Sequence, residues 1–223
     1  MSTPLSPTDR TTVRRGSKRA VTDRAALHAL LADALVAHVG VDTGEHPVVL
    51  PVAFAADLDG PDDEGTLYIH GSVAARWLNA SEATTVCVTI TELDGLVAAR
   101  SGFHHSMNYR SAVVIGRARV VTDPDEKAHA LALTVDHMVP GRSATLREPT
   151  RKELAATSVL AVPLAEASLK QRSGDPVDEP GDVEAGVWAG VIPVRRVAGD
   201  AISAADSHAD VPTDVTARAA ALG

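Results

Sequence analysis

The sequence predicts a mainly β fold: a mostly antiparallel β barrel with helices inserted between its strands. Apolar runs of strand length recur along the chain and are separated by loops rich in Gly, Pro and Asp. These runs do not alternate regularly with helical patterns, which argues against a parallel βαβ fold. Hydrophobic residues form 45% and charged residues 22% of the 223 residues, so a core can be built without disulfides.

Composition divides the chain into three sections. Residues 1–20 are rich in Ser, Thr, Pro and Arg and are expected to form a flexible N-terminal arm. Residues 21–198 carry the strand-like runs and are expected to form one barrel domain. Residues 199–223 are Ala-rich and polar and are expected to form a tail, with a helix after Pro212.

The first part of the barrel domain contains both helical and strand-like patterns of apolar residues. From Asp23 to His38 apolar residues recur with the spacing of one buried helical stripe. The continuous apolar run at 48–55 predicts a strand, and 66–71 predicts its hairpin partner. A short helix is expected at 74–80.

Further strands are expected at 83–91, 96–99, 110–121, 159–164 and 186–194. Asp94-Gly95 is expected to turn the chain between the first two of these strands. Cys87 is the only cysteine, so no disulfide or Cys-based metal site is expected, and it should behave as a small buried hydrophobe in its strand.

Two helix starts are well marked. Asp123 is a predicted N-cap, followed by Pro124 at the first helical position and by Glu126, and this helix must stop before Pro140. Thr150 and its third following residue, Glu, form a second capping box.

Charge and hydropathy exclude several classes of function. The net charge is −8 and the pI is near 5.5, which disfavours nucleic acid and anionic membranes as partners. The sequence contains no apolar run of the roughly 18 residues that span a bilayer, and its first residues carry no apolar signal core. A cytoplasmic location is therefore expected.

Polar groups at strand ends mark the first candidate ligand site. His70-Gly71-Ser72 ends a predicted strand, where glycine would let a ligand approach the backbone. Arg76 follows and offers a guanidinium fork to a phosphate.

Two further polar segments lie later in the chain. Residues 100–111 are rich in His, Ser, Asn and Arg, which suit a phosphate or the polar edge of a ring. His104 and His105 are neighbours that would point in opposite directions, so no metal site is predicted. The third segment is 168–172, with Trp188 beyond a polar loop.

In this order, the segments resemble the flavin-nucleotide-binding branch of the pyridoxamine 5'-phosphate oxidase-like family, which includes proteins implicated in nitroimidazole resistance. The resemblance covers roughly residues 12–197. It rests on Arg14-Arg15, Tyr68–Ser72 with Arg76, Asp94–Val97, His105–Ser111, Pro140–Arg142, Ser168–Lys170 and Trp188–Pro193.

The resemblance implies a six-stranded FMN-binding split barrel that forms a homodimer, with two FMN sites at the subunit interface. In that arrangement Arg76, Arg110 and Ser111 would hold the FMN phosphate. The other implied cofactor contacts are Ile69, His70, Gly71 and Ser72 along the isoalloxazine, Asn108 and Tyr109, and Lys170 and Trp188 closing the site.

The implied function is an FMN-dependent oxidoreductase acting on a small molecule. Here the flavin performs the electron chemistry while the protein orients it. His70 is the first candidate for a catalytic side chain near the ring, and His105 is the second.

Two positions depart from the family pattern. Val191-Ile192 stands where pyridoxamine phosphate oxidases place an arginine for the substrate phosphate, and Trp77 replaces a lysine that follows the first phosphate arginine. Pyridoxamine phosphate is therefore not the expected substrate.

Other functions remain open from the sequence. A non-catalytic flavin-binding or flavin-sensing protein fits the absence of a compelling acid–base pair. The same barrel with deazaflavin or haem is a further alternative. Haem would need an axial histidine, for which the candidates are His70, His104 and His105.

Overall fold

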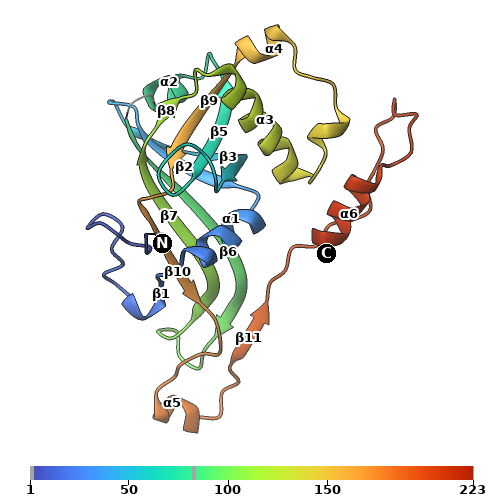
Figure 1. The fold of residues 1–223 in the computed structure, drawn as a ribbon. Coiled ribbons are helices and arrows are strands. Elements are labelled where there is room, and N and C mark those ends of the chain that lie inside the picture. The colour runs from blue at the N-terminus through green and yellow to red at the C-terminus, as the bar shows by residue number, and fades with distance from the viewer. Residues whose placement is uncertain (1–2, 82–83, 223) are drawn as a thin grey trace.

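The computed structural model describes residues 3–81 and 84–222, which fold into two β-sheets with helices around them (Figure 1). Every strand pairing within these residues is antiparallel, which confirms the predicted fold class. The strands are β1 Ala20–Val21, β2 Ala37–Asp42, β3 Pro47–Val52, β4 Phe54–Asp57, β5 Thr66–Ser72, β6 Thr85–Ala98, β7 Ser106–Arg117, β8 Arg119–Val120, β9 Thr157–Pro163, β10 Ala167–Arg172 and β11 Gly190–Pro193. The α-helices are α1 Arg24–Asp33, α2 Arg76–Ser81, α3 Pro124–Met138, α4 Arg151–Ala156, α5 Pro180–Glu184 and α6 Thr213–Leu222.

The core lies between the two sheets. The larger sheet has the order β1-β10-β7-β6-β2-β3, with β11 paired to β6, and the smaller sheet has the order β4-β5-β9-β8. Val88 and Val114 of the larger sheet join Leu67 and Ile69 of the smaller sheet in one buried cluster. Helix α1 adds Leu30 to this cluster, so the apolar stripe of the helix is buried as its spacing predicts.

The predicted helix from Asp23 is too long at its C-terminal end. Asp23 caps α1, and its carboxylate accepts a hydrogen bond from the Ala25 amide at 3.0 Å, but the helix ends at Asp33. His38 lies in β2 and pairs with Pro51. Residues from Ala37 onward alternate between buried and exposed, so strand pairing overrides the helical spacing there.

The apolar run at 48–55 is two strands and not one. β3 belongs to the larger sheet and β4 to the smaller one, and Ala53 separates them. This switch between sheets splits the barrel at the point where the sequence shows only a continuous apolar run.

Asp94-Gly95 is a bulge and not the predicted turn. β6 runs without interruption through both residues, and its register against β7 shifts between Leu93 and Gly95. A β-carbon at Gly95 would lie 3.0 Å from Val191 Cγ1 and 3.2 Å from the Ile192 oxygen. Glycine at the bulge therefore gives β11 room to pair with β6.

Two features of the larger sheet differ from expectation. β7 begins at Ser106, so half of the polar segment 100–111 is strand, and β10 was not predicted as a strand because its second half is polar. Cys87 is exposed, because Val86 and Val88 occupy the inward positions of β6 and alternation turns the cysteine outward.

The predicted helix caps are confirmed. The Asp123 carboxylate accepts hydrogen bonds from the Asp125 and Glu126 amides, and α3 ends before Pro140. Thr150 forms the capping box of α4. α2 and α6 lie where short helices were expected.

The described residues of the N-terminal segment pack on the larger sheet, and the expected flexibility of this arm stays a prediction. Leu5 is 3% exposed and the Ser6 amide donates to the Ala167 oxygen at 2.7 Å. Arg10 forms an ion pair with Glu166. Burial of Leu5 with these polar contacts holds the described residues of this arm against the sheet.

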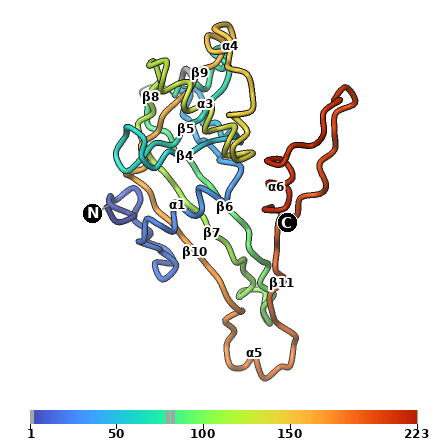
Figure 2. The backbone as a smooth tube through the Cα atoms, turned by 45° about the vertical axis from the view of Figure 1, so that its right-hand side comes forward, coloured from blue at the N-terminus to red at the C-terminus, as the bar shows by residue number. Residues whose placement is uncertain are grey.

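The C-terminal section contacts the end of α3 after the chain has passed through α5 and β11. Figures 1 and 2 show α5 at the end of the molecule opposite α3 and α4, with the chain after β11 leading back to α6. The Arg218 Nε donates to the Met138 oxygen at 2.8 Å, which fastens α6 to α3. Within the described residues, no helix has the length and apolar character needed to cross a membrane.

Candidate functional site

The two arginines predicted to share a phosphate lie in different cavities. Arg76 lines a cavity of about 440 Å³, here called the Arg76 cavity, together with Thr43, His46 and Trp77. Arg110 lines a second cavity of about 430 Å³, here called the Arg110 cavity. Within one chain these arginines therefore do not line a common cavity, because the two cavities share no residue.

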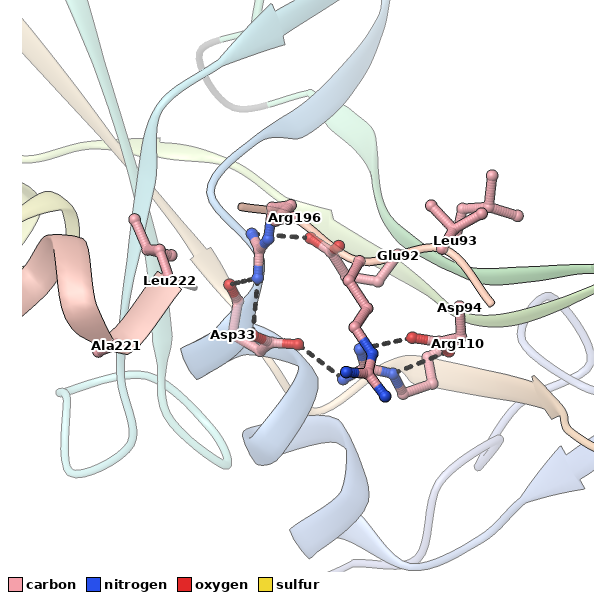
Figure 3. Close-up of a pocket in the computed structure, with 10 residues that line it drawn as sticks. Asp33, Glu92, Leu93, Asp94, Arg110, Arg196, Ala221 and Leu222 are labelled. Carbon is pink, nitrogen blue, oxygen red and sulfur yellow. Dashed lines mark hydrogen bonds and ion pairs between the residues drawn. The ribbon is translucent and has the colours of Figure 1, made fainter. Parts of the chain in front are cut away.

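All three nitrogens of the Arg110 guanidinium contact carboxylates (Figure 3). Its Nε and Nη2 donate to the Asp94 carboxylate at 3.1 and 2.9 Å, and its Nη1 lies 2.9 Å from Asp33 Oδ2. These bonds, with that to Asp94 foremost, raise the pKa of Arg110. In this chain all three nitrogens of Arg110 contact carboxylates, and its predicted role as a phosphate donor stays a prediction.

A second arginine from the C-terminal section completes the network. Arg196 Nη2 donates to Asp33 Oδ1 at 2.7 Å and to the Asp33 backbone oxygen at 2.8 Å, and Nη1 lies 3.3 Å from Glu92 Oε1 (Figure 3). Asp33 thus bridges Arg110 and Arg196. The Arg110 cavity is consequently walled by ion pairs that join α1, β6, β7 and the chain after β11.

The carboxyl group of Glu92 is the member of this network whose charged form is disfavoured by burial. Burial raises the pKa of Glu92 above its ordinary value, and the nearby Arg196 opposes this only in part. A partly buried carboxyl with a raised pKa is a common feature of functional cavities, although ion-pair networks also produce it.

The second and third polar segments meet as neighbouring strands. Ser111 of β7 faces Lys170 of β10 in the register, and Ser111 Oγ lies 2.8 Å from Thr91 Oγ1. Arg172 donates to Asn108, which also donates to the Gly174 oxygen at 3.1 Å. The predicted contacts Asn108, Ser111 and Lys170 therefore share one part of the larger sheet, whereas Tyr109 has no side-chain contact that assigns it a role.

His104 and His105 lie at the end of this region, in a cavity of about 420 Å³ that also includes Arg19 and Arg172. The Nδ1 of His104 lies 3.0 Å from Ser101 Oγ, and that of His105 lies 2.9 Å from the Ser101 oxygen. Both rings are thus held by one residue of the β6–β7 connection. The catalytic role predicted for His105 stays a prediction.

His70 lies apart from these residues, in β5 of the smaller sheet. Its Nδ1 is buried and has no hydrogen-bond partner within the described chain, and burial lowers the pKa of this imidazole. Buried polar atoms are nearly always paired, so an orphaned ring nitrogen points to a missing partner. His28 Nε2 is orphaned in the same way, beside a cavity of only about 210 Å³.

Three of the residues around His70 have structural explanations. Ile69 is 1% exposed in the main core, so its side chain cannot reach a ligand. A β-carbon at Gly71 would lie 2.7 Å from Leu78 Cδ1, so glycine here accommodates α2. Ser72 Oγ accepts a hydrogen bond from the Ala74 amide at 3.2 Å. Because alternation along β5 turns the Ile69 side chain inward, only its backbone could lie along a flavin, and that predicted contact stays a prediction.

Trp188 and Lys170 are not neighbours in one chain. β7 and β6 lie between β10, which carries Lys170, and β11, which Trp188 precedes. Trp188 packs on Gly190, where a β-carbon would lie 2.9 Å from the indole Cζ2, and it is 68% exposed. Closure of a single site by both residues would need a second chain.

Two antiparallel sheets, between which the chain crosses at Ala53, define a split-barrel protein. The model of the family described as pyridoxamine 5'-phosphate oxidase matches residues 23–171. The chain belongs to this family, and the predicted family and fold class are confirmed.

Solved structures extend the likeness beyond the family model. The flavocytochrome Anf3 from Azotobacter vinelandii is 36% identical with a TM-score of 0.88, covering 96% of this chain and 98% of that chain. The FAD and haem binding protein from Mycobacterium smegmatis is 38% identical with a TM-score of 0.82, covering 90% and 97%.

A structure described as a 5-nitroimidazole antibiotic resistance protein from Bacteroides thetaiotaomicron shares the fold at 22% identity. Its TM-score is 0.55, and the match covers 68% of this chain and 85% of that chain. No curated protein matches the chain.

Sequence reasoning missed Asp33, Glu92 and Arg196. These residues lie at a helix end, within a strand and after a strand, and no local motif links them. The adjacent pair Arg195-Arg196 was the only available signal, and its partners could be found only from the tertiary structure.

Replacing Glu92 with Gln should change how stability depends on pH. The folded state raises the pKa of Glu92, so it binds this proton more tightly than the unfolded state, and the resulting stability is lost as the pH rises from the ordinary value of 4.5. The free energy of unfolding of Glu92→Gln, relative to the native protein, should therefore increase between pH 4.5 and 7.

Urea unfolding at a series of pH values measures this difference. Glu184→Gln, the same substitution on the exposed end of α5, is the matched control. A Glu92→Gln difference that stays constant over this range would contradict the burial argument.

Proposed function

We propose that the protein is a flavin-dependent oxidoreductase that also binds haem. The observation that carries this proposal is the likeness to two proteins named as a flavocytochrome and as an FAD and haem binding protein, which spans nearly the whole chain. That likeness includes the C-terminal section, which the family model leaves out.

The flavin is proposed to be FAD in preference to the FMN predicted from the sequence, because the Mycobacterium smegmatis relative is named for FAD. The Arg76 cavity is a candidate for its phosphate end. Arg76 has no ion-pair partner within the described residues, and Thr43, His46 and the Trp77 ring share the cavity. Its volume of about 440 Å³ falls within the range of small-molecule sites.

Haem is proposed to use His70 as an axial ligand. Of the three candidate histidines, His104 and His105 have Nδ1 contacts with Ser101, whereas His70 has an orphaned buried nitrogen. The lowered pKa of His70 keeps the ring neutral near pH 7, as metal ligation requires. His28, whose Nε2 is also buried without a partner among the described residues, is the second candidate.

The flavin and the haem would supply the electron transfer, and the residues of the chain would bind and orient them. Arg76 would bind phosphate, and His70 would hold the haem iron through its ring. A flavin-binding protein without a substrate remains the second candidate, since no general acid–base pair is assembled among the described residues.

A homodimer is proposed to complete the flavin site. Ile192 of β11, Leu96 of β6 and Met107 of β7 lie opposite one another in the register and so share one face of the sheet. They are 55%, 44% and 51% exposed, an apolar row that a second copy would cover. Assembly would also bring a second chain's residues to cavities that one chain leaves open. A cytoplasmic location remains part of the proposal, supported by the single free cysteine.

The absorption spectrum of the purified protein tests the two-cofactor proposal. It should show flavin bands together with a Soret band, and mass spectrometry of the released ligand should identify FAD. His70→Ala should lose the Soret band and keep the flavin bands, because the ligand to the iron is removed. His208→Ala, in the exposed C-terminal section, should keep both.

A Soret band of unchanged position and intensity in His70→Ala would overturn the ligand assignment. Protein that binds neither group after supply of both would overturn the proposed function. Stopped-flow reduction by NADH or NADPH, followed by reoxidation with acceptors, distinguishes the oxidoreductase from the passive binder.

Arg76→Ala should weaken flavin binding without unfolding the protein. A charge-assisted hydrogen bond contributes about 1.5–3 kcal/mol, which corresponds to a roughly 10- to 150-fold increase in Kd. Fluorescence titration of the flavin-free protein measures this Kd. Arg117→Ala, at the exposed end of β7, is the control, and equal affinities in both variants would remove Arg76 from the site.

Leu96→Asp should dissociate the proposed dimer, because it places a charge in the centre of the apolar row. Sedimentation velocity should show the native protein as a dimer and the variant as a monomer. Val49→Asp, on exposed β3 outside the row, should leave the dimer intact. A native protein that sediments as a monomer at all concentrations would disprove the assembly.

A further inference from the structure

A histidine and two aspartates from separate segments meet where the β6–β7 connection approaches α5. Ligand atoms of His104, Asp178 and Asp182 all lie within 4.8 Å of one another, and each residue is half-buried. Asp182 belongs to α5, which lies at the far end of the molecule in Figure 1. This group lies outside the Arg76 and Arg110 cavities and away from His70.

The ring of His104 is oriented for a ligand at its other nitrogen. Nδ1 lies 3.0 Å from Ser101 Oγ, so Nε2 is the nitrogen left available. Nε2 is 4.0 Å from Glu179 Oε1, which adds a further carboxylate on that side. Metal-bound histidines commonly have their second nitrogen held by such a hydrogen bond, which fixes the ring and its tautomer.

Asp178 is held by a second set of contacts. Its side chain is 1% exposed, and its two oxygens accept hydrogen bonds from the Arg100 backbone amide at 3.1 Å and from Arg100 Nη1 at 2.8 Å. Each carboxylate oxygen retains a further lone pair for a cation. Arg100 thus orients the carboxylate without exhausting it.

The charge balance of the group is negative. Asp182 has no ion pair among the described residues, and Glu179 has only the distant contact with His104. Three carboxylates therefore lie near a single guanidinium and one imidazole. A divalent cation would remove this imbalance.

We propose that His104, Asp178 and Asp182 form a binding site for a divalent transition-metal cation of the Zn²⁺ class. One imidazole and two carboxylates, with water in the remaining position, are a donor set that suits zinc, whereas an all-oxygen set would suit magnesium or calcium. The cation would fasten the loop at 173–189, which carries the exposed Trp188, to the β6–β7 connection. The site is independent of the proposed flavin and haem.

Calorimetric titration with Zn²⁺ tests the site in tag-free, cofactor-loaded protein after treatment with a chelator. The native chain should bind one Zn²⁺ per chain. His104→Ala and Asp182→Asn should each raise the Kd more than tenfold, since each removes a direct ligand. Asp175→Asn, on the same loop but outside the group, should bind as the native chain does.

Proteolysis by a glutamate-specific protease gives an independent readout, since Glu179 and Glu184 lie in the loop. Zn²⁺ should slow cleavage of the native chain and of Asp175→Asn but not of Asp182→Asn. Asp182→Asn alters an exposed five-residue helix, so it tests the site even if His104→Ala does not fold. Absence of saturable Zn²⁺ binding, or equal Kd values for the native chain and both ligand variants, would overturn the proposal.

Discussion

The bulge at Asp94 and Gly95 determines how the C-terminal part of the chain attaches to the barrel. A strand with one extra residue bends and redirects its side chains. In β6 this bulge places Asp94 against Arg110, while the missing side chain of Gly95 leaves room for Val191 and Ile192 of β11. The pairing of β11 then starts the return path toward α6. A regular strand would close off this edge of the sheet.

Once β11 is paired, a shared carboxylate holds the next segment in place. Asp33 ends α1 and binds both Arg110 and Arg196, so the helix, the sheet and the returning chain depend on one another. Interacting charges of this kind cannot be treated as independent, because the removal of one leaves its partners unpaired in partly buried surroundings. The ion pairs of this network therefore have a structural role: they hold α1, the larger sheet and the returning chain together. This leaves Arg76, which has no such partner, as the arginine better suited to a phosphate.

Several local features were predictable because their physics is local. The caps at Asp123 and Thr150 satisfy the first amides of their helices through side chains a few residues away, so composition and spacing suffice. The strand at 66–71 and the polar character of 106–111 were likewise visible. The helix predicted through His38 was too long, because the apolar residues after Asp33 fit both the helical and the strand spacing. Pairing with β3 decides in favour of a strand.

The candidate site was predicted less well. The sequence named Asn108, Ser111 and Lys170, which do lie on adjacent strands. It could not show that Arg110 forms ion pairs with two aspartates. Nor could it show that β6 and β7 separate Trp188 from Lys170. By itself the sequence determined the class of fold, the family and the caps, because these depend on short-range patterns and ordered motifs. The tertiary structure alone decided which charges are already neutralised and which nitrogen of His70 is left without a partner, because burial and pairing arise between segments far apart in the chain.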